Sequence, residues 1–209
     1  MMNIERNIII TESTETGIDK KFLNNLCKQL NLKFSIFPKN NIEGVLSYLE
    51  GKKTAEIYNG SINNILIIVD ADKNPKKRFQ DIVKIIKKDN FSTNYNIPQT
   101  LGVVNKKEEN KINIGVFLFP NNKDTGSLET LLYDNLNIKS KNKKECAEDY
   151  IQCIQNKESE MTENNISKAK FRILNATPNP DRYIKNVDES IDYNSDNLNT
   201  LKDFLKQIE

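Results

Sequence analysis

The sequence predicts an α/β fold: a three-layer, Rossmann-like domain with a mainly parallel central sheet and a C-terminal helical extension. Two observations support this prediction. Segments with the pattern of strands alternate with segments with the pattern of helices over residues 7–134, which is typical of a parallel sheet covered by helices. In addition, residues 65–69 form an unbroken apolar run, as expected for a central strand that is covered on both faces.

The N-terminal part of this pattern contains two predicted strands and two predicted helices. Residues 7–11 are a β-branched run that indicates a buried strand, and residues 18–31 carry apolar side chains at helical spacing. Residues 33–37 alternate in polarity and predict a strand that stops at Pro38. A second helix follows and is expected to end near Gly51.

The middle of the chain continues the alternation. The apolar strand at residues 65–69 leads into Asp70, and Pro75 is predicted to begin the next helix, because proline is favoured in the first helical turn. The remaining elements predicted for this part are a short strand at residues 101–104, a strand at 112–119 that ends before Pro120, and a helix from residue 128 with Ser127 as its candidate cap.

The last third of the chain is predicted to be mostly helical. Residues 137–145 are rich in lysine and indicate an exposed linker. The segments predicted after it are a helix at 147–154, a short strand or helix at 169–174, and an amphipathic terminal helix at 198–208. We therefore expect an α/β core over residues 1–136 and an extension over residues 137–209 that packs on it as one compact unit.

The amino-acid composition excludes several classes of catalytic and metal site. The chain has no histidine, which excludes serine–histidine–aspartate triads, cysteine–histidine dyads and zinc sites built on histidine. Its three cysteines lie outside any C-x-x-C spacing, and no signal peptide or long apolar run is seen, so we expect a cytoplasmic protein with no membrane segment. The net charge of +2 offers no overall electrostatic attraction to nucleic acid, only a local one.

Acidic residues follow two of the predicted strands. Glu12 ends the first strand, with Glu15 three residues later, and Asp70 and Asp72 end the central strand. Residues two apart on a strand share a face, so we expect both aspartates to turn toward one point, which Glu12 joins if the two strands are neighbours. Clustered carboxylates repel unless a cation neutralises them, and they are the ligands that Mg²⁺ or Mn²⁺ prefers. Aspartates after strands also serve as helix caps and turn residues, which is the structural alternative.

Other proteins that use an Asp-x-Asp motif fit the surrounding sequence less well. Phosphatases of the haloacid dehalogenase type carry a threonine two residues after the motif, whereas Lys73 and Asn74 follow Asp72 here. Sugar-nucleotide transferases also use Asp-x-Asp, but their nucleotide-binding context is not visible. No glycine-rich phosphate loop of the Walker or Rossmann type is present.

The order of these motifs resembles the Toprim domain of topoisomerases, primases and OLD-family nucleases. The first strand ending in Glu12, the helix–strand–helix that follows, and the strand ending in Asp70 and Asp72 carry this resemblance. A small bacterial group of Toprim-like proteins is more similar still. Its motifs correspond here to residues 11–16, 69–72, 119–122 and 126–129, together with residues 168–170 and the closing helix.

The resemblance implies roles for individual residues. Glu12 would be the general acid/base or a metal ligand, and Asp70 and Asp72 would bind Mg²⁺. Glu15 and Glu129 would complete a second metal position, although Glu129 also suits the first turn of a helix for its charge alone. Lys170, or Lys168 beside it, would supply the lysine that OLD-type nucleases place near the scissile phosphate; the alternative is that both are surface lysines.

Three positions depart from the pattern of the group. Ser13 replaces the glycine that follows the first-strand glutamate, Thr16 replaces the second acid of the opening motif, and Asn121 replaces the aspartate of Pro-Asp-Asn. These changes weaken the second metal position. A one-metal enzyme or a catalytically reduced domain is therefore an alternative.

We accordingly expect a metal-dependent phosphoryl-transfer protein, foremost a DNA or RNA endonuclease of Toprim type with Mg²⁺ or Mn²⁺ as cofactor. Its partner would be the phosphate backbone of nucleic acid, and the basic residues just after Asp72 give this local support: Lys73, Lys76, Lys77 and Arg78. A solvated lysine-rich helix start is the structural alternative. The functional alternative is a catalytically reduced module that binds nucleic acid or a separately encoded ATPase, by analogy with OLD proteins and phage defence.

Overall fold

The structure is a computed structural model. It describes residues 7–51, 62–87, 95–106, 108, 111–136, 141–156, 161–176 and 191–208.

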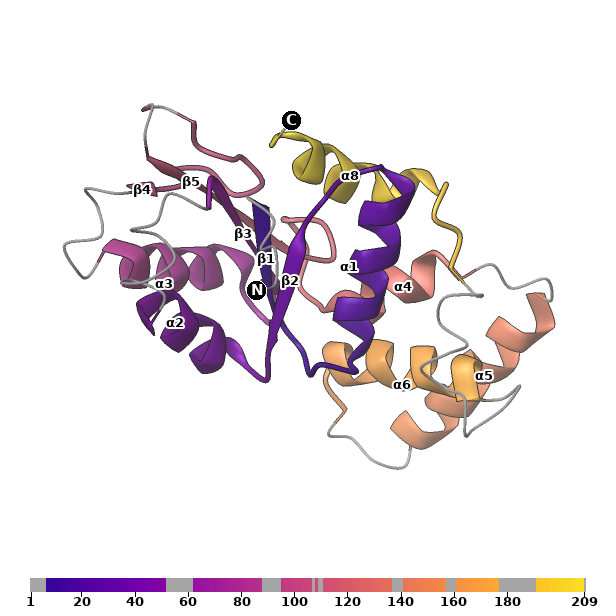
Figure 1. The fold of residues 1–209 in the computed structure, drawn as a ribbon. Coiled ribbons are helices and arrows are strands. Elements are labelled where there is room, and N and C mark those ends of the chain that lie inside the picture. The colour runs from indigo at the N-terminus through magenta and orange to yellow at the C-terminus, as the bar shows by residue number, and fades with distance from the viewer. Residues whose placement is uncertain are drawn as a thin grey trace.

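The centre of the fold is a five-stranded sheet in the order β2-β1-β3-β5-β4, with every pair of neighbouring strands parallel (Figure 1). Its strands are β1 (Asn7–Glu12), β2 (Ser35–Lys39), β3 (Asn64–Asp70), β4 (Tyr95–Asn96) and β5 (Ile112–Phe119). β3 is buried along almost its whole length, as its continuous apolar sequence predicted. Because all strands run the same way, their carboxyl ends meet at one edge of the sheet.

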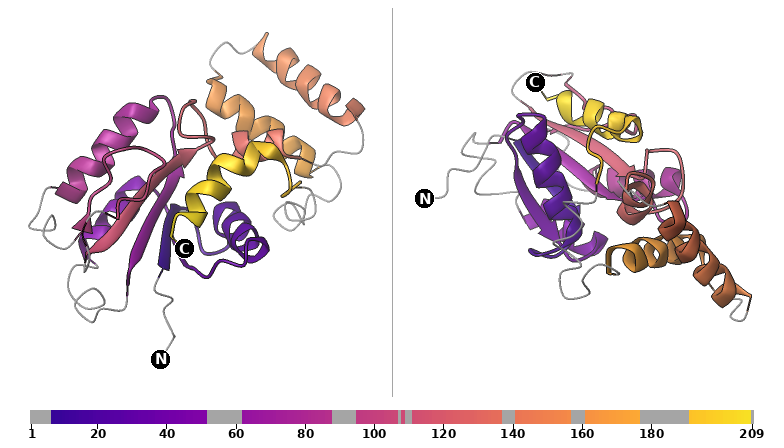
Figure 2. Two further views of the ribbon diagram at one scale, coloured as in Figure 1. Left: turned by 90° about the horizontal axis from the view of Figure 1, so that it is seen from above. Right: turned by 90° about the vertical axis from the view of Figure 1, so that its right-hand side faces the viewer.

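Helices cover both faces of the sheet, which confirms the predicted three-layer α/β fold (Figure 2). On one face lie α2 (Ile42–Gly51) and α3 (Pro75–Lys87). The other face packs against α1 (Ile18–Gln29), α4 (Leu128–Asp134) and the terminal pair formed by the 3₁₀ turn η3 (Asp196–Leu198) and α8 (Asn199–Lys206). The side chains of successive strand residues alternate between these two hydrophobic cores.

The C-terminal part contributes to the same core. α5 (Lys141–Gln155) packs against α6 (Glu163–Ala176), which packs against α4. Phe171 of α6 is fully buried in the core cluster that contains α1 and α4. α8 returns to the sheet, where the rings of Phe204 and Phe117 lie 5.5 Å apart.

Several predicted elements are corrected by the structure. β2 continues through Pro38 instead of stopping there, which is tolerated because β2 is an edge strand. Residues 101–104 form no strand; they run beside β5 as a turn and a loop, with Gly102 N–H donating to Val116 O at 2.9 Å. The predicted linker at residues 137–145 is helical from Lys141 onward, and residues 169–174 belong to α6.

No helix among the described residues is long and apolar enough to cross a membrane.

Candidate active site

Acidic side chains gather at the carboxyl edge of the sheet because β1 and β3 are neighbours. The two strands are paired with Thr11 opposite Ile68, so Glu12 follows on one strand where Asp70 ends the other. β1 and β3 are therefore neighbours, as the predicted convergence of Glu12 and Asp70 requires. The carboxylates of this edge nevertheless face different partners.

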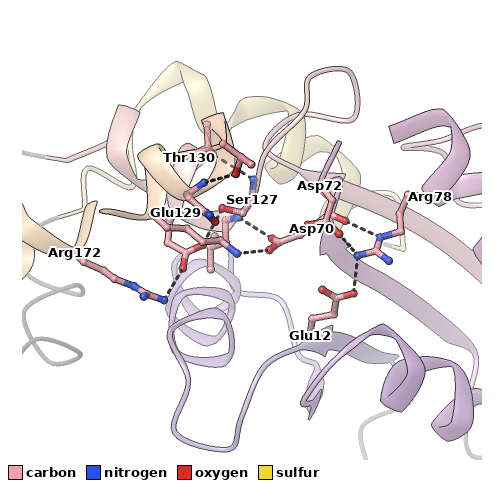
Figure 3. Close-up of polar contacts among 12 residues, drawn as sticks. Glu12, Asp70, Asp72, Arg78, Ser127, Glu129, Thr130 and Arg172 are labelled. Atoms are coloured by element: carbon pink, nitrogen blue, oxygen red, sulfur yellow. Dashed lines mark hydrogen bonds and ion pairs between the residues drawn. The ribbon is translucent and has the colours of Figure 1, made fainter. Parts of the chain in front are cut away.

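Glu12 and Asp72 share the guanidinium group of Arg78, which comes from the first turns of α3 (Figure 3). The terminal nitrogen Nη2 of Arg78 lies 3.3 Å from Glu12 Oε1 and also donates a hydrogen bond to Asp72 Oδ2. Arg78 Nε donates to the backbone carbonyl of Asp70 at 3.1 Å. One arginine thus joins the ends of both strands on the α3 side of the sheet.

The carboxylate of Asp70 points away from Arg78, toward α4 and α6 (Figure 3). Its Oδ1 accepts a hydrogen bond from the backbone N–H of Leu128 at 2.9 Å, and its Oδ2 lies 3.5 Å from Lys168 Nζ. Asp70 therefore holds the start of α4 with one oxygen and contacts α6 with the other.

Strand alternation and a turn explain why the acids diverge. Ile10 belongs to the core under α2 and α3, and Ile68 to the core under α1 and α4, so Glu12 and Asp70 project from opposite faces of the sheet. Asp72 lies beyond the strand with a positive φ of 52° and forms an antiparallel bridge with Gly126. The expectation that Asp70 and Asp72 turn toward one point is therefore wrong: the left-handed turn directs Asp72 to Arg78.

The environment raises the pKa of both strand-end acids. Burial raises the pKa of Glu12 to about 7, although the positive charge of Arg78 lowers it, and the negative charge of Asp70 adds to the increase. Burial raises the pKa of Asp70 to about 6 against the lowering effect of Lys168. The basic residues of the site therefore do not fully compensate the cost of placing two carboxylates here.

Two consecutive side chains at the end of β1 hold oxygen atoms that are buried without a hydrogen-bond partner: Thr11 Oγ1 and Glu12 Oε1. The hydroxyl of Ser13, the next residue, faces the carboxylate of Asp19. Glu12 Oε1 is close to Arg78 but outside hydrogen-bond geometry. Unsatisfied buried oxygens are uncommon in folded proteins, and they mark a place suited to a water molecule or a cation.

Asp19, in the first turn of α1, is an acidic residue of this site that the sequence analysis missed. Burial and the negative charges of Asp70 and Glu129 raise its pKa to about 7. An acid in the first turn of a helix is ordinarily explained by the helix dipole, so the sequence did not indicate that Asp19 also lies near Asp70 and Glu129. Only the packing of α1 on this face of the sheet, which brings Asp19 near Asp70 and Glu129, reveals it.

Glu129 lies near Asp70 and Asp19, on the α4 side of the site. The hydroxyl of Ser127 donates to Glu129 Oε2 at 2.9 Å, and Arg172 of α6 lies 3.8 Å from Glu129 Oε1. Ser127 is also the N-cap residue of α4, as predicted. Glu129 thus occupies the first turn of a helix and the acidic site at once, so the two alternatives of the sequence analysis coincide.

Two residues proposed from the sequence have different surroundings. Glu15 lies on the surface with its side chain 75% exposed and forms an ion pair with Lys20. The ammonium group of Lys170 lies 5.8 Å from the centre of the Tyr133 ring. Lys168 contacts Asp70 instead, because residues two apart on a helix face different directions.

A cavity of about 1000 Å³ opens beside Asp72 and Arg78. The start of α3, residues 125–126 and the start of α6 form its wall, so the C-terminal extension closes one side of it. Its charged lining comprises Asp72, Lys73, Lys77, Arg78 and Asp81, and hydroxyl and amide side chains supply most of the rest. The cavity therefore contains both signs of charge.

Within the part of the chain that the structure describes, no three acidic, cysteine or histidine side chains stand close enough to hold one metal ion together. Glu12 and Asp72 are paired with Arg78, and Asp70 is paired with Lys168. Glu12 Oε1 and Asp72 Oδ2 approach one nitrogen of Arg78 at 3.3 Å and 2.5 Å, so at most about 6 Å separates these two oxygens.

The model of one protein family, described as protein of unknown function (DUF3226), matches residues 7–209. The chain belongs to the DUF3226 family. No curated protein and no solved structure matches it. The DUF3226 match covers the whole described fold from β1 to α8, so the acidic strand ends, Arg78 and Lys168 all lie within the family's extent.

Proposed function

We propose that this DUF3226 protein is a metal-dependent phosphodiesterase, foremost a DNA or RNA endonuclease of Toprim type. One observation carries the proposal: adjacent parallel strands bring Glu12 and Asp70 to the same edge of the sheet, both largely buried, with Asp72 just beyond them. Carboxyl ends of parallel strands are where α/β folds bind ligands. Acids buried at such an edge cost stability and are retained where chemistry requires them.

The residues fit a Mg²⁺ or Mn²⁺ ion by their chemistry. Glu12 and Asp72 are hard oxygen donors on the α3 side of the site, where Glu12 Oε1 is buried without a hydrogen-bond partner, and Asp70 is a hard oxygen donor on the α4 side. The pKa values of Glu12 and Asp70 stay raised in the presence of Arg78 and Lys168, so the site has capacity for more positive charge. Glu129 and Asp19 would support a second ion on the opposite side of Asp70.

A bound Mg²⁺ supplies a Lewis acid that polarises a phosphate and lowers the pKa of water. The chain's own residues supply the rest. Glu12 would accept a proton from the attacking water through its other carboxylate oxygen, Oε2. The Lys168 ammonium, held beside Asp70, offsets the charge that develops on the phosphate oxygens.

The nucleic acid backbone would lie along the cavity beside Asp72. Lys73 and Lys77 line this cavity together with Asp72. A phosphate chain needs such cations next to a cluster of carboxylates, which would otherwise repel it. The wall contributed by α6 means that the C-terminal extension takes part in binding the substrate.

A nicking assay tests this proposal. Supercoiled plasmid, single-stranded DNA and single-stranded RNA are incubated with the protein and Mg²⁺ or Mn²⁺. We expect cleavage that EDTA abolishes and that Asp70→Asn or Glu12→Gln reduces at least ~100-fold, the usual scale for a lost acid–base group. Glu15→Gln is the matched control, because Glu15 is an exposed acid outside the cluster. Cleavage that survives in Asp70→Asn would refute the proposed site.

The second candidate function is a non-catalytic Toprim-like module that binds nucleic acid or a separately encoded ATPase. The pairing of Glu12 and Asp72 with Arg78 favours it, because this arrangement neutralises part of the acidic cluster without a metal. Fluorescence anisotropy with labelled oligonucleotides in EDTA separates the two candidates. Tight binding in EDTA with no cleavage in Mn²⁺ would favour the module.

A further inference from the structure

Arg78 occupies the space between two carboxylates that the proposed metal would need. Its Nη2 lies 3.3 Å from Glu12 Oε1 and donates a hydrogen bond to Asp72, and its Nε donates to the backbone carbonyl of Asp70. The side chain is only 19% exposed. The guanidinium therefore provides the positive charge of this half of the site.

We propose that Arg78 is a displaceable internal counter-ion. It holds Glu12 and Asp72 in a resting arrangement, and a divalent cation that binds these two carboxylates drives the guanidinium out from between them. The inference rests on the proposed metal-dependent function and adds its regulation. Because the same two oxygens serve Arg78 or the cation, the two occupants exclude each other.

The contacts of Arg78 are unequal, which makes its displacement feasible. The ion pair with Glu12 has no hydrogen-bond geometry, and Glu12 Oε1 is left without a hydrogen-bond partner. The Glu12 carboxylate therefore loses no hydrogen bond when the guanidinium leaves. Asp72 is 48% exposed, so water and ions reach that end of the pair directly.

The structure also provides a place for the released side chain. Arg78 lines the cavity of about 1000 Å³, so its guanidinium has open space on one side. Asp81 lines the same cavity one helical turn further along α3. Residues three apart on a helix are neighbours on its surface, so Asp81 gives the released guanidinium a second carboxylate partner.

Exclusive occupancy has a measurable consequence. Removing the guanidinium frees both carboxylates for the cation, so metal affinity should rise. Coupling between two binding events of this kind typically amounts to about 5- to 150-fold in affinity. We therefore expect Mn²⁺ to bind Arg78→Gln about tenfold or more tightly than the unchanged protein.

The experiment measures Mn²⁺ binding to the full chain by electron paramagnetic resonance of the free ion. The variants are Arg78→Gln, Arg78→Lys, which keeps a charge near Glu12, and Lys84→Gln as control, because Lys84 lies in the last turn of the same helix and lines a different pocket. We expect tight binding for Arg78→Gln, an intermediate value for Arg78→Lys and no change for Lys84→Gln. Circular dichroism verifies that each variant is folded.

A second measurement follows the arginine itself. The chain has four arginines, so a ¹⁵N spectrum of arginine Nε groups holds few signals, and the one missing in Arg78→Lys belongs to Arg78. We expect Mg²⁺ to shift this signal, because Nε leaves the carbonyl of Asp70. Asp81→Asn should weaken Mg²⁺ binding severalfold, because the released guanidinium then lacks its second partner.

The outcomes separate this inference from the proposed function. Metal binding that is equally tight with and without Arg78, with an unchanged Nε signal, would overturn the counter-ion role and leave the metal-dependent function standing. If neither the unchanged protein nor Arg78→Gln binds Mn²⁺ at millimolar concentration, both proposals are refuted. Tighter binding in Arg78→Gln together with a Mg²⁺-dependent Nε shift supports both.

Discussion

The ammonium group of Lys168 lies 3.5 Å from Asp70 Oδ2, which connects the C-terminal extension to the end of the central strand. The other oxygen of the same carboxylate accepts the backbone N–H of Leu128 at the start of α4. Asp70 thereby organises two helices that follow it far along the chain. The extension is consequently part of the candidate site.

This contact predicts a difference between two lysines of one helix. Lys168→Met should lower the free energy of unfolding by about 1 kcal/mol at pH 8, because a largely buried carboxylate loses its cation while the partner lysine is partly exposed. Lys170→Met should change it by less than about 0.5 kcal/mol, as is usual away from such pairs. Urea denaturation measures both. Equal losses in the two variants would show that the Asp70 contact contributes nothing.

Stability should depend on pH in a direction opposite to that of ordinary salt-bridged acids. The pKa values of Glu12 and Asp19 are raised to about 7 and that of Asp70 to about 6, all above their ordinary values near 4. The folded protein therefore binds more protons than the unfolded chain between pH 4 and 7. Because of this, the free energy of unfolding falls as pH rises through that window.

Asp19→Asn isolates one part of this effect. The amide cannot ionise, so the variant should be more stable than the unchanged protein at pH 8, by about 1–3 kcal/mol, and nearly equal to it at pH 4. Urea denaturation at pH 4, 6 and 8 in EDTA supplies the measurement. A constant difference at all three pH values would contradict a raised pKa for Asp19.

Metal binding should counteract the loss of stability at high pH. Protons and Mg²⁺ compete for the same carboxylates, so 5 mM Mg²⁺ is expected to raise the melting temperature more at pH 8 than at pH 6. Glu12→Gln should remove most of this increase, whereas Glu15→Gln should keep it. Differential scanning fluorimetry is sufficient. A pH-independent shift, or one retained in Glu12→Gln, would place the ion elsewhere.

Gly115 in the middle of β5 is required by the packing of α8. A Cβ atom there would come within 2.8 Å of Val104 Cγ2 and 2.9 Å of the Phe204 ring. Gly115→Ala should therefore destabilise the protein by about 1–3 kcal/mol, the usual cost of overpacking. Gly44→Ala, in helix α2 with its nearest contacts at 3.3 Å, is the comparison and should cost far less. Similar midpoints in urea for the two variants would refute the packing argument.

Thiol reactivity provides a check of the core. Burial raises the pKa of Cys27 to about 12, whereas Cys146 and Cys153 are exposed on α5. Two thiols should react rapidly with Ellman's reagent at pH 8 and one only on unfolding, because the thiolate is the reactive form. Three fast thiols would mean that α1 is not packed on the sheet as described.

The sequence by itself determined the kinds of element and their order. The unbroken apolar run before Asp70 predicted a central strand, and the helical spacing around Leu26 and Ile82 predicted the helices that cover it. These features are local, because a hydrophobic period of two or 3.6 residues can be recognised from consecutive side chains. The same reasoning placed Glu12 and Asp70 at strand ends.

Tertiary structure alone decided the partners of those acids. Alternation on two neighbouring strands sends Glu12 and Asp70 to opposite faces, and the left-handed turn at Asp72 directs it to Arg78. The packing of α1 brings Asp19 into the site, and α6 selects Lys168 over Lys170. These outcomes depend on strand register and on the rotation of packed helices. Both are set by long-range contacts that no local pattern in the chain records.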